Sequence, residues 1–333
     1  YTTKPDCFYE TIINWVDRRY HWKIKKEWII FTPGVIPGYT ITIQNFTKPG
    51  DGIIVQTPVY YPFMDGVVNN GRKLVYNPLI EKEGDWFMDF EDLERKVKDP
   101  DNKLLILSNP HNPVGRAWTA EELTRLGDLC AENGVLLISD EIHADLMMKG
   151  VKHTSVGTLS EKIKKNTIVH YAPSKTFNLA GLVGSYHIIY NRLLRDRVEK
   201  ASSLSHYNSP NVLSVHALIG AYRPEGYQWV DELREVLKSN ADYAYNYILE
   251  HFKGVKLSKP EGTYMLYLDC EEWCKEHDTD MDTLLKAGVA VGVIWQDGRP
   301  FHRPYAIRLN LALPHVLVKE AFDRMDKYVF NAK

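Results

Sequence analysis

The sequence predicts an α/β protein with a mainly parallel central sheet, followed by a smaller α+β C-terminal domain. Up to about residue 210, short apolar runs alternate with amphipathic stretches, which is the pattern of strands connected by helices in a parallel sheet. Beyond that point, a long helical stretch precedes strands that are interspersed with helices. A chain of 333 residues exceeds the size at which one hydrophobic core stops growing, so we expect two domains, residues 1–212 and residues 213–333.

The first half of the chain contains short, nearly continuous apolar runs that are typical of strands buried on both faces. We expect strands at residues 52–56, 104–107, 135–139 and 167–171. Capping residues mark the helices between them: Asp6 begins one helix and Asp89 another. Thr119 and Glu122 form a capping box ahead of a third helix, whose apolar face includes Cys130.

The second half has longer helices and fewer strands. The spacing of apolar residues predicts a helix over 229–252 and a final helix over 314–330. Between them, apolar runs predict strands over 263–269 and 305–313. This arrangement is the basis for expecting a smaller α+β domain after residue 212.

Composition and charge limit the classes of partner. The formal net charge is −2, so nothing in the charge balance favours nucleic acid or an anionic membrane surface. No apolar run reaches the length of a membrane span, so we expect no membrane insertion. The four cysteines form no C-x-x-C pair, which favours a reducing compartment, and we expect the cytoplasm.

Three polar residues lie just past predicted strands. Asn112, Asp140 and Lys175 each follow a buried apolar run within a few residues. Ligands of open α/β sheets bind at the carboxyl ends of the strands. The three side chains therefore predict a binding site at one edge of the sheet.

Lys175 and Asp140 each have an ordinary reading and a chemical one. A lysine is most often solvated surface, but Lys175 follows a buried strand among small residues, and partial burial lowers an amine pKa in a way that suits Schiff-base chemistry. Asp140 is a turn acid with Glu141 as its solvated neighbour, or a carboxylate that pairs with a cation. The local pattern leaves both alternatives open.

Other candidate residues carry weaker signals. The turn at residues 34–38 could present free N–H groups to a phosphate, although it lacks a P-loop lysine and the G-x-G-x-x-G spacing of a dinucleotide site. Tyr60 could stack on a planar cofactor or fill the core. Arg308 could lie on a solvated strand face or bind a carboxylate with two hydrogen bonds.

Four motifs in order resemble those of fold-type-I pyridoxal 5'-phosphate (PLP) enzymes of the aminotransferase class I/II superfamily. They are Asn-Pro-His-Asn-Pro-Val-Gly at 109–115, Ser-Asp-Glu at 139–141, Ser-Lys at 174–175 and an arginine in an apolar strand at 308. Longer segments are similar to the MalY/PatB group of cystathionine β-lyases, also called C–S lyases, and the likeness runs along the whole chain. These segments are 32–37, 58–63, 109–115, 139–146 and 172–182. The resemblance implies a PLP-dependent transferase-like large domain.

The resemblance also implies roles for the candidate residues. Lys175 would bind the cofactor as a Schiff base and then act as the base at the substrate Cα. Asp140 would pair with the pyridine nitrogen, Asn112 would donate to the phenolic oxygen, and Tyr60 would stack on the ring. Arg308 would hold the substrate carboxylate.

Further roles follow from the same resemblance. The backbone N–H groups of Val35 and Ile36, together with Ser174, would hold the phosphate. His143 occupies a place where many aminotransferases carry a tyrosine, which favours the lyase group. Tyr1 resembles a tyrosine that reaches the phosphate of a partner subunit, which implies a homodimer with shared active sites. Members of the group carry several dozen residues ahead of this position, so we expect the chain to lack that segment.

The implied activity is β-elimination from a cystathionine- or cysteine-type thioether, giving a thiol, pyruvate and ammonia. An aminotransferase acting on a small amino acid is the alternative, because it shares the same steps up to the carbanion. A PLP-fold regulator without turnover is a third reading, although the chain shows no helix-turn-helix pattern. Residues 295–304 differ from the shorter glycine-rich loop of the group, which leaves the substrate open.

Overall fold

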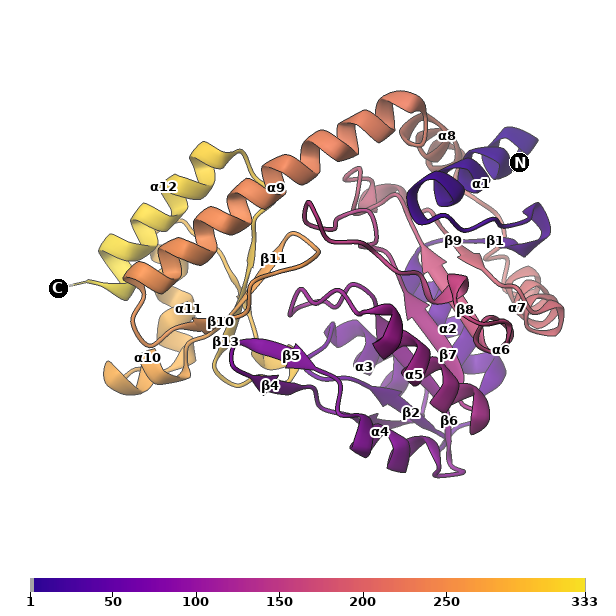
Figure 1. Ribbon diagram of the computed structural model, residues 1–333, viewed down its shortest axis with the longest axis horizontal. Helices are drawn as coiled ribbons and strands as arrows, with labels where there is room; N and C mark the ends of the chain where they lie inside the picture. Colours follow the sequence, from indigo (N-terminus) through magenta and orange to yellow (C-terminus); the bar gives the residue numbers. More distant parts are fainter. Residues whose placement is uncertain (1–2, 333) are drawn as a thin grey trace.

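The computed structural model describes residues 3–332, which contain two larger sheets of different construction and a two-stranded hairpin. The larger sheet and its helices occupy one end of the molecule, and the C-terminal sheet and its helices occupy the other (Figure 1). The long helix α9 (Pro224–His251) runs between these two ends. The division of the chain at residue 212 stays a prediction, but each sheet has its own buried core.

The large sheet is seven-stranded and mainly parallel, as predicted. In spatial order it contains β1 (Ile29–Thr32), β9 (Ser185–Ile188), β8 (Thr167–Tyr171), β7 (Leu136–Asp140), β6 (Asn102–Ser108), β2 (Gly52–Val55) and β3 (Lys73–Tyr76). Only β9 runs against its neighbours among these strands. The four predicted strands of the first half correspond to β2, β6, β7 and β8.

Helices cover both faces of this sheet, which explains the continuous apolar strands. They are α1 (Asp6–Tyr20), α2 (Val35–Phe46), α3 (Tyr61–Asn69), α4 (Phe90–Val97), α5 (Ala120–Glu132), α6 (Glu161–Lys165), α7 (Arg192–Leu204) and α8 (Val212–Ala221). Along β2, Ile53 packs with α2 and α3, whereas Ile54 packs with α4 and α5 on the opposite face. Successive side chains of a strand point to opposite faces, so both must be apolar here.

The C-terminal part contains a four-stranded antiparallel sheet. Its order is β10 (Lys256–Leu257), β11 (Met265–Asp269), β13 (Ala306–Asn310) and β12 (Gln296–Asp297). Helices α9, α10 (Glu271–Glu276), α11 (Met281–Ala290) and α12 (His315–Met325) surround it, and a π-helical turn (Asp326–Phe330) follows α12. The predicted α+β character is therefore present in this half.

Element boundaries differ from the sequence expectations where local polar contacts intervene. Helix α9 begins at Pro224, ahead of the predicted residue 229, because the first turn of a helix tolerates a proline without an N–H. Strand β13 ends at Asn310 because its side chain accepts a hydrogen bond from the Ala312 N–H at 2.8 Å and turns the chain. The capping box of Thr119 and Glu122 is present as predicted.

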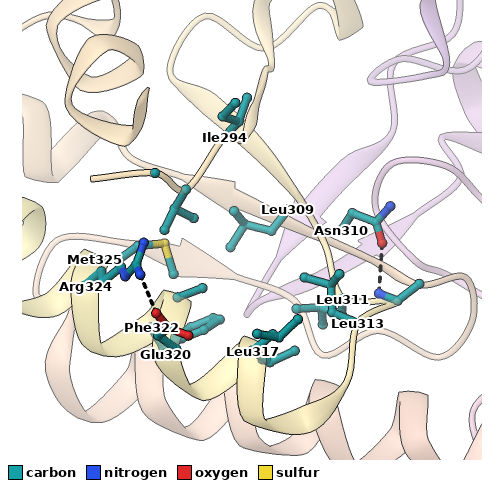
Figure 2. A pocket seen from close by; sticks show the side chains of 15 residues that line it. Ile294, Leu309, Asn310, Leu311, Leu313, Leu317, Glu320, Phe322, Arg324 and Met325 are labelled. Atoms are coloured by element: carbon teal, nitrogen blue, oxygen red, sulfur yellow. Dashed lines mark hydrogen bonds and ion pairs between the residues drawn. The ribbon is translucent and has the colours of Figure 1, made fainter. Parts of the chain in front are cut away.

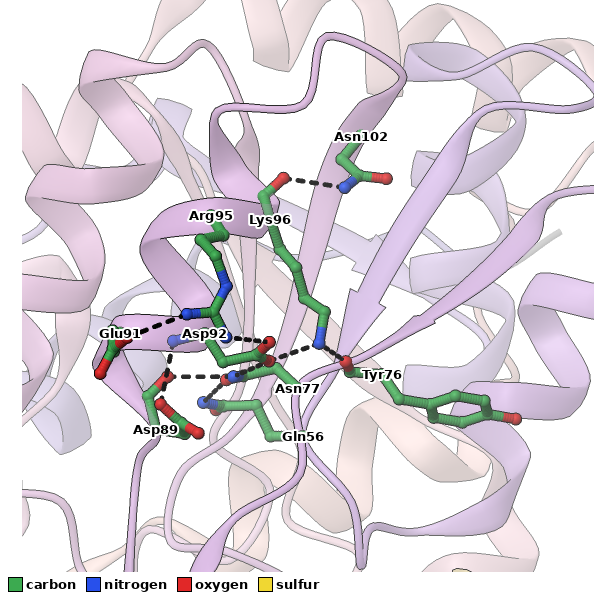
Figure 3. Close-up of polar contacts among 9 residues, drawn as sticks. All are labelled: Gln56, Tyr76, Asn77, Asp89, Glu91, Asp92, Arg95, Lys96 and Asn102. Carbon is green, nitrogen blue, oxygen red and sulfur yellow. Dashed lines mark hydrogen bonds and ion pairs between the residues drawn. The ribbon is translucent and has the colours of Figure 1, made fainter.

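A partly buried polar network fixes the outer edge of the large sheet (Figure 3). Gln56 donates to Asn77 at 3.0 Å, and Asn77 donates to Asp92 on α4 at 2.9 Å. Lys96, one turn further along α4, contacts both Asp92 and the carbonyl of Tyr76 at the end of β3. The network anchors α4 to the carboxyl ends of β2 and β3.

The antiparallel hairpin of β4 (Ile80–Lys82) and β5 (Asp85–Phe87) links the two ends of the molecule. It follows β3 and lies beside the small sheet (Figure 1), where Glu81 forms an ion pair with Arg303 at 2.5 Å. Among residues 3–332, no helix is both long and apolar enough to cross a membrane.

Candidate active site

A cavity of about 270 Å³ opens at the carboxyl ends of the central strands, between the two sheets. Every candidate residue that the structure describes lines it. These residues are Val35, Ile36, Tyr60, Asn112, Asp140, His143, Ser174, Lys175 and Arg308. Tyr1, the remaining candidate, lies outside the described residues.

The parallel strands bring the first group of side chains together. Asp140 is the last residue of β7, and Lys175 follows β8 by a short turn. Asn112 lies beyond β6, where its N–H donates to the hydroxyl of Ser108 at 3.1 Å. Its carbonyl accepts from the N–H of Tyr60 at 3.1 Å, so the loops after β2 and β6 are joined beside the cavity.

The first turn of α2 faces the same cavity. Gly34 precedes the helix with a φ of 103°, a backbone conformation that favours glycine, and Val35 and Ile36 are the first two helical residues. The first N–H groups of a helix have no intrahelical partner, and Pro37 has none to offer. Val35 and Ile36 therefore supply a pair of N–H donors at the positive end of a helix dipole, which is suited to an anion.

Asp140 is a buried acid with an unusual protonation equilibrium. Its side chain is 7% exposed, and burial raises its pKa to about 7. The Ile142 N–H donates to its Oδ1 at 3.1 Å, and the charge of Lys175 also favours ionisation, but neither offsets burial. A positively charged ligand group beside this carboxyl would stabilise its ionised form.

Lys175 and His143 are shifted in the opposite direction. Burial lowers the pKa of the half-buried Lys175 amine, the charge of Asp140 opposes this shift only in part, and the nearby Arg308 lowers the pKa further. Burial lowers the pKa of His143 to about 3, so its ring is neutral at pH 7. Its Nδ1 is buried and has no hydrogen-bond partner among the described residues, and the ring lies edge-on to Tyr264 with centroids 5.4 Å apart.

Arg308 reaches the cavity from β13 in the small sheet. One guanidinium nitrogen donates to Asn112 Oδ1 at 2.8 Å and the other donates to Gln296 Oε1. The guanidinium carbon also lies 4.8 Å from the ring centroid of Phe301. The solvated-face reading of Arg308 is therefore wrong, because the side chain joins the two sheets at the cavity.

The sequence reading missed several residues at or behind this cavity. Gln296 and Phe301 lie in the unusual 295–304 segment and contact Arg308, yet no local pattern distinguishes them. The reading of Glu141 as a solvated acid is wrong, since its side chain is completely buried. It accepts from the hydroxyl of Ser139 and the N–H of Val156, each at 3.0 Å, which offsets the cost of burial.

A larger cavity of about 460 Å³ lies elsewhere, between β13 and α12 (Figure 2). Its lining is mainly apolar, and its Arg324 and Glu320 bind each other. None of the candidate residues lines it. The volume of a cavity therefore does not identify the candidate active site in this molecule.

Comparison with known proteins identifies the class to which this fold and cavity belong. Residues 2–325 match the family model described as aminotransferase class I and II. The chain belongs to this family.

Individual relatives show which members of this family the chain is similar to. The chain is 40% identical over 291 residues to cystathionine β-lyase PatB of Bacillus subtilis, covering 87% of this chain and 75% of that protein. It is similar to the crystal structure of cystalysin from Treponema denticola, which contains PLP, with a TM-score of 0.94, 34% identity, and coverage of 100% and 84%. It is also similar to the PLP-bound C–S lyase of Staphylococcus hominis, with a TM-score of 0.90, 31% identity, and coverage of 98% and 84%.

Proposed function

We propose that the cavity holds PLP and that Lys175 binds it covalently. The observation that carries this proposal is a desolvated carboxyl, Asp140, lining one cavity with a half-buried amine of lowered pKa. Asp140 would face the pyridine nitrogen of the cofactor, whose protonated form would supply the missing positive charge. The N–H groups of Val35 and Ile36 suit a phosphate, and Ser174 adds a hydroxyl.

The remaining cavity residues suit the body of the cofactor. Tyr60 offers a ring to stack on, Asn112 offers its amide N–H groups, and its Oδ1 is already engaged by Arg308. The unpartnered Nδ1 of His143 is available to a polar ligand group. When bound, PLP supplies an electron sink that stabilises negative charge developing at the Cα of an amino acid.

The reaction proposed is β-elimination from an amino acid with a sulfur leaving group at Cβ. Arg308 holds the α-carboxylate in an orientation fixed by Asn112 and Gln296. The freed amine of Lys175 takes the proton from Cα, and its lowered pKa keeps a larger fraction neutral and able to accept it. The thiolate leaves from Cβ and takes up a proton, and water hydrolyses the resulting 2-aminoacrylate, so the products are a thiol, pyruvate and ammonia. The similarity of the chain to cystathionine β-lyase PatB and to the C–S lyase of S. hominis supports this choice.

Transamination is the second candidate, because the family includes aminotransferases and the residues around the cofactor serve either reaction. The neutral His143 at a position where many aminotransferases carry tyrosine favours elimination. The two activities differ in one requirement, since transamination needs a keto-acid acceptor and elimination does not.

The deciding experiment incubates the PLP-loaded protein with cystathionine, with and without 2-oxoglutarate. We expect pyruvate and free thiol at equal rates in both samples, and none from the Lys175→Ala variant. If no pyruvate forms in either sample and glutamate forms only when 2-oxoglutarate is present, the lyase proposal is wrong and the protein is an aminotransferase.

We also propose that the protein is a homodimer whose second copy covers the mouth of the cavity. Ile36 and Val183 line the cavity but are 42% and 51% exposed, and Leu213, at the start of the neighbouring helix α8, is 61% exposed. Apolar side chains exposed around a binding site favour burial by another surface. Light scattering should give twice the chain mass, whereas a fully active monomer would contradict the proposal.

The cytoplasm is the compartment that we propose, because all four cysteines are free and three of them are buried. Cell fractionation tests this assignment. Recovery of the protein outside the cytoplasm would contradict it.

A further inference from the structure

The end of β7 and the segment that follows it carry three carboxyl groups, and only one of them lines the cavity. Asp140 does, whereas Glu141 and Asp145 are buried beside it, at 0% and 7% exposure. The Glu141 carboxylate accepts a hydrogen bond from the hydroxyl of Tyr171 and also contacts Nε2 of His153. Asp145 binds two parts of the chain that are distant in sequence, and the proposed reaction gives it no role.

Both oxygens of Asp145 are occupied by donors. Its Oδ1 accepts from the hydroxyl of Tyr20 at 2.6 Å and from Trp15 Nε1 at 3.2 Å. Its Oδ2 accepts from the hydroxyl of Thr176 at 2.9 Å. Trp15 and Tyr20 belong to α1, and Thr176 is the residue directly after Lys175. One buried carboxylate therefore joins the N-terminal helix to the lysine segment.

The α1 side of this connection is held by aromatic packing. Trp15 is fully buried and stacks on Tyr222 with ring centroids 4.2 Å apart. It also lies edge-on to Phe177 at 5.7 Å, so it contacts a second residue close to Lys175. Two buried donors on a packed helix leave the Asp145 side chain little freedom to move, and Thr176 is 1% exposed at the other end.

The lysine segment itself has little regular structure. Residues 172–179 are in neither a helix nor a strand, and two backbone hydrogen bonds, Phe177 to Pro173 and Leu179 to Ser174, brace it at 2.9 Å each. Thr176 is the residue directly after Lys175, and its hydroxyl gives this segment a buried side-chain hydrogen bond to Asp145. A small displacement of a reacting group lowers rates by large factors, so this contact is well placed to matter.

We propose that Asp145 is a positioning residue for Lys175: it fixes the backbone of the lysine through Thr176, and α1 holds Asp145 in place through Trp15 and Tyr20. The proposal rests on the proposed attachment of PLP to Lys175. Helix α1 is distant in sequence from Lys175, and the proposal gives this helix a part in placing the reactive amine. The alternative is that the carboxylate only stabilises the fold.

Two variants of equal severity separate these readings. Thr176→Val keeps the side-chain shape and removes the hydrogen bond beside Lys175. Tyr20→Phe keeps the ring and removes a hydrogen bond to the same carboxylate on the far side. Each should lower the unfolding temperature of the cofactor-free protein to a similar extent, because each deletes one buried donor to Asp145.

The measurement is the rate at which PLP becomes attached to the cofactor-free protein, followed by absorbance without any amino acid, with its pH profile. Thr176→Val should slow attachment by about tenfold and displace the pH profile. Tyr20→Phe should attach PLP within about twofold of wild type, because Trp15 Nε1 still holds Asp145 from α1 and Thr176 still connects it to the lysine segment. Thr176→Ser should restore the wild-type rate and profile, since it restores the hydroxyl.

Equal attachment rates and pH profiles in wild type, Thr176→Val and Tyr20→Phe would overturn the positioning role, as would an equal loss in both variants. Failure of the wild-type protein to attach PLP at all would overturn the cofactor proposal together with this one. Attachment is measured without substrate, so failure of cystathionine cleavage leaves the test of Asp145 unaffected.

Discussion

The large-sheet side and the small-sheet side of the cavity hold their polar groups in different ways. On the large-sheet side, Asp140 and Lys175 are desolvated and their charges are poorly compensated, so the pKa of one is raised and that of the other is lowered. On the small-sheet side, Arg308 is already engaged by Asn112, Gln296 and Phe301.

This difference indicates how each side would respond to a ligand. A carboxyl held at a pKa of about 7 gains a large interaction when a cationic ring nitrogen arrives. An arginine that neighbouring groups already orient changes little on binding, and its partners determine how well its donors match a carboxylate. We therefore expect the largest effects of substitution on the large-sheet side and graded effects on the small-sheet side.

The largest expected effect is that of Asp140→Asn. Turnover should fall by several orders of magnitude, because an unprotonated pyridine is a poor electron sink. The fold should remain intact, and kcat measured at saturating PLP tests this prediction. Turnover near that of wild type would remove Asp140 from the site and with it the contrast between the two sides.

The same variant should have the opposite effect on stability. Because the folded-state pKa of Asp140 is raised to about 7, the folded protein binds more protons than the unfolded chain between about pH 4 and 7, and stability falls as pH rises through this window. The loss is about 1.4 kcal/mol for each pH unit there. Cofactor-free Asp140→Asn should be more stable than wild type at pH 8, whereas Asp65→Asn, at an exposed acid, should not.

A smaller effect is expected for Arg308→Lys. An ammonium cannot reproduce the fork of a guanidinium, and the lost charge-assisted bonding of about 1.5–3 kcal/mol should raise KM by one to two powers of ten. The value of kcat should change less, since the proton transfer lies on the other side of the cavity. An unchanged KM would show that another group binds the carboxylate, and Arg324→Lys on α12 is the matched control.

The smallest effect is expected for Gln296→Leu. Removing one acceptor leaves Asn112 and Phe301 to hold the guanidinium, so KM should rise by about two- to tenfold with kcat unchanged. A rise in KM as large as that expected for Arg308→Lys would mean that Gln296 is essential for binding the carboxylate. The small-sheet side would then tolerate substitution no better than the large-sheet side.

The two sides of the cavity also differ in how well their residues could be predicted from the sequence. On the large-sheet side, strand ends and turn residues are local features, and parallel strands carry them to one edge of the sheet. This is why Asn112, Asp140 and Lys175 could be brought together from the sequence alone. The predicted strands β2, β6, β7 and β8 required only continuous apolar runs.

The partners of Arg308 depend on long-range register, which no local pattern contains. Gln296 contacts Arg308 because β12 pairs antiparallel with β13 and places these two residues opposite each other. The contacts of buried polar residues are equally impossible to predict from the local sequence. The local sequence indicates a solvated acid at Glu141, and the proposed role of Asp145 depends on donors more than a hundred residues away in α1.

The most direct test of the whole account is to reduce the PLP-loaded protein with borohydride and map the modified peptide. We expect a visible absorbance that borohydride bleaches and a pyridoxyl group on Lys175, in the segment that follows β8. A pyridoxyl group on a different lysine, or no absorbance when PLP is added, would contradict the account.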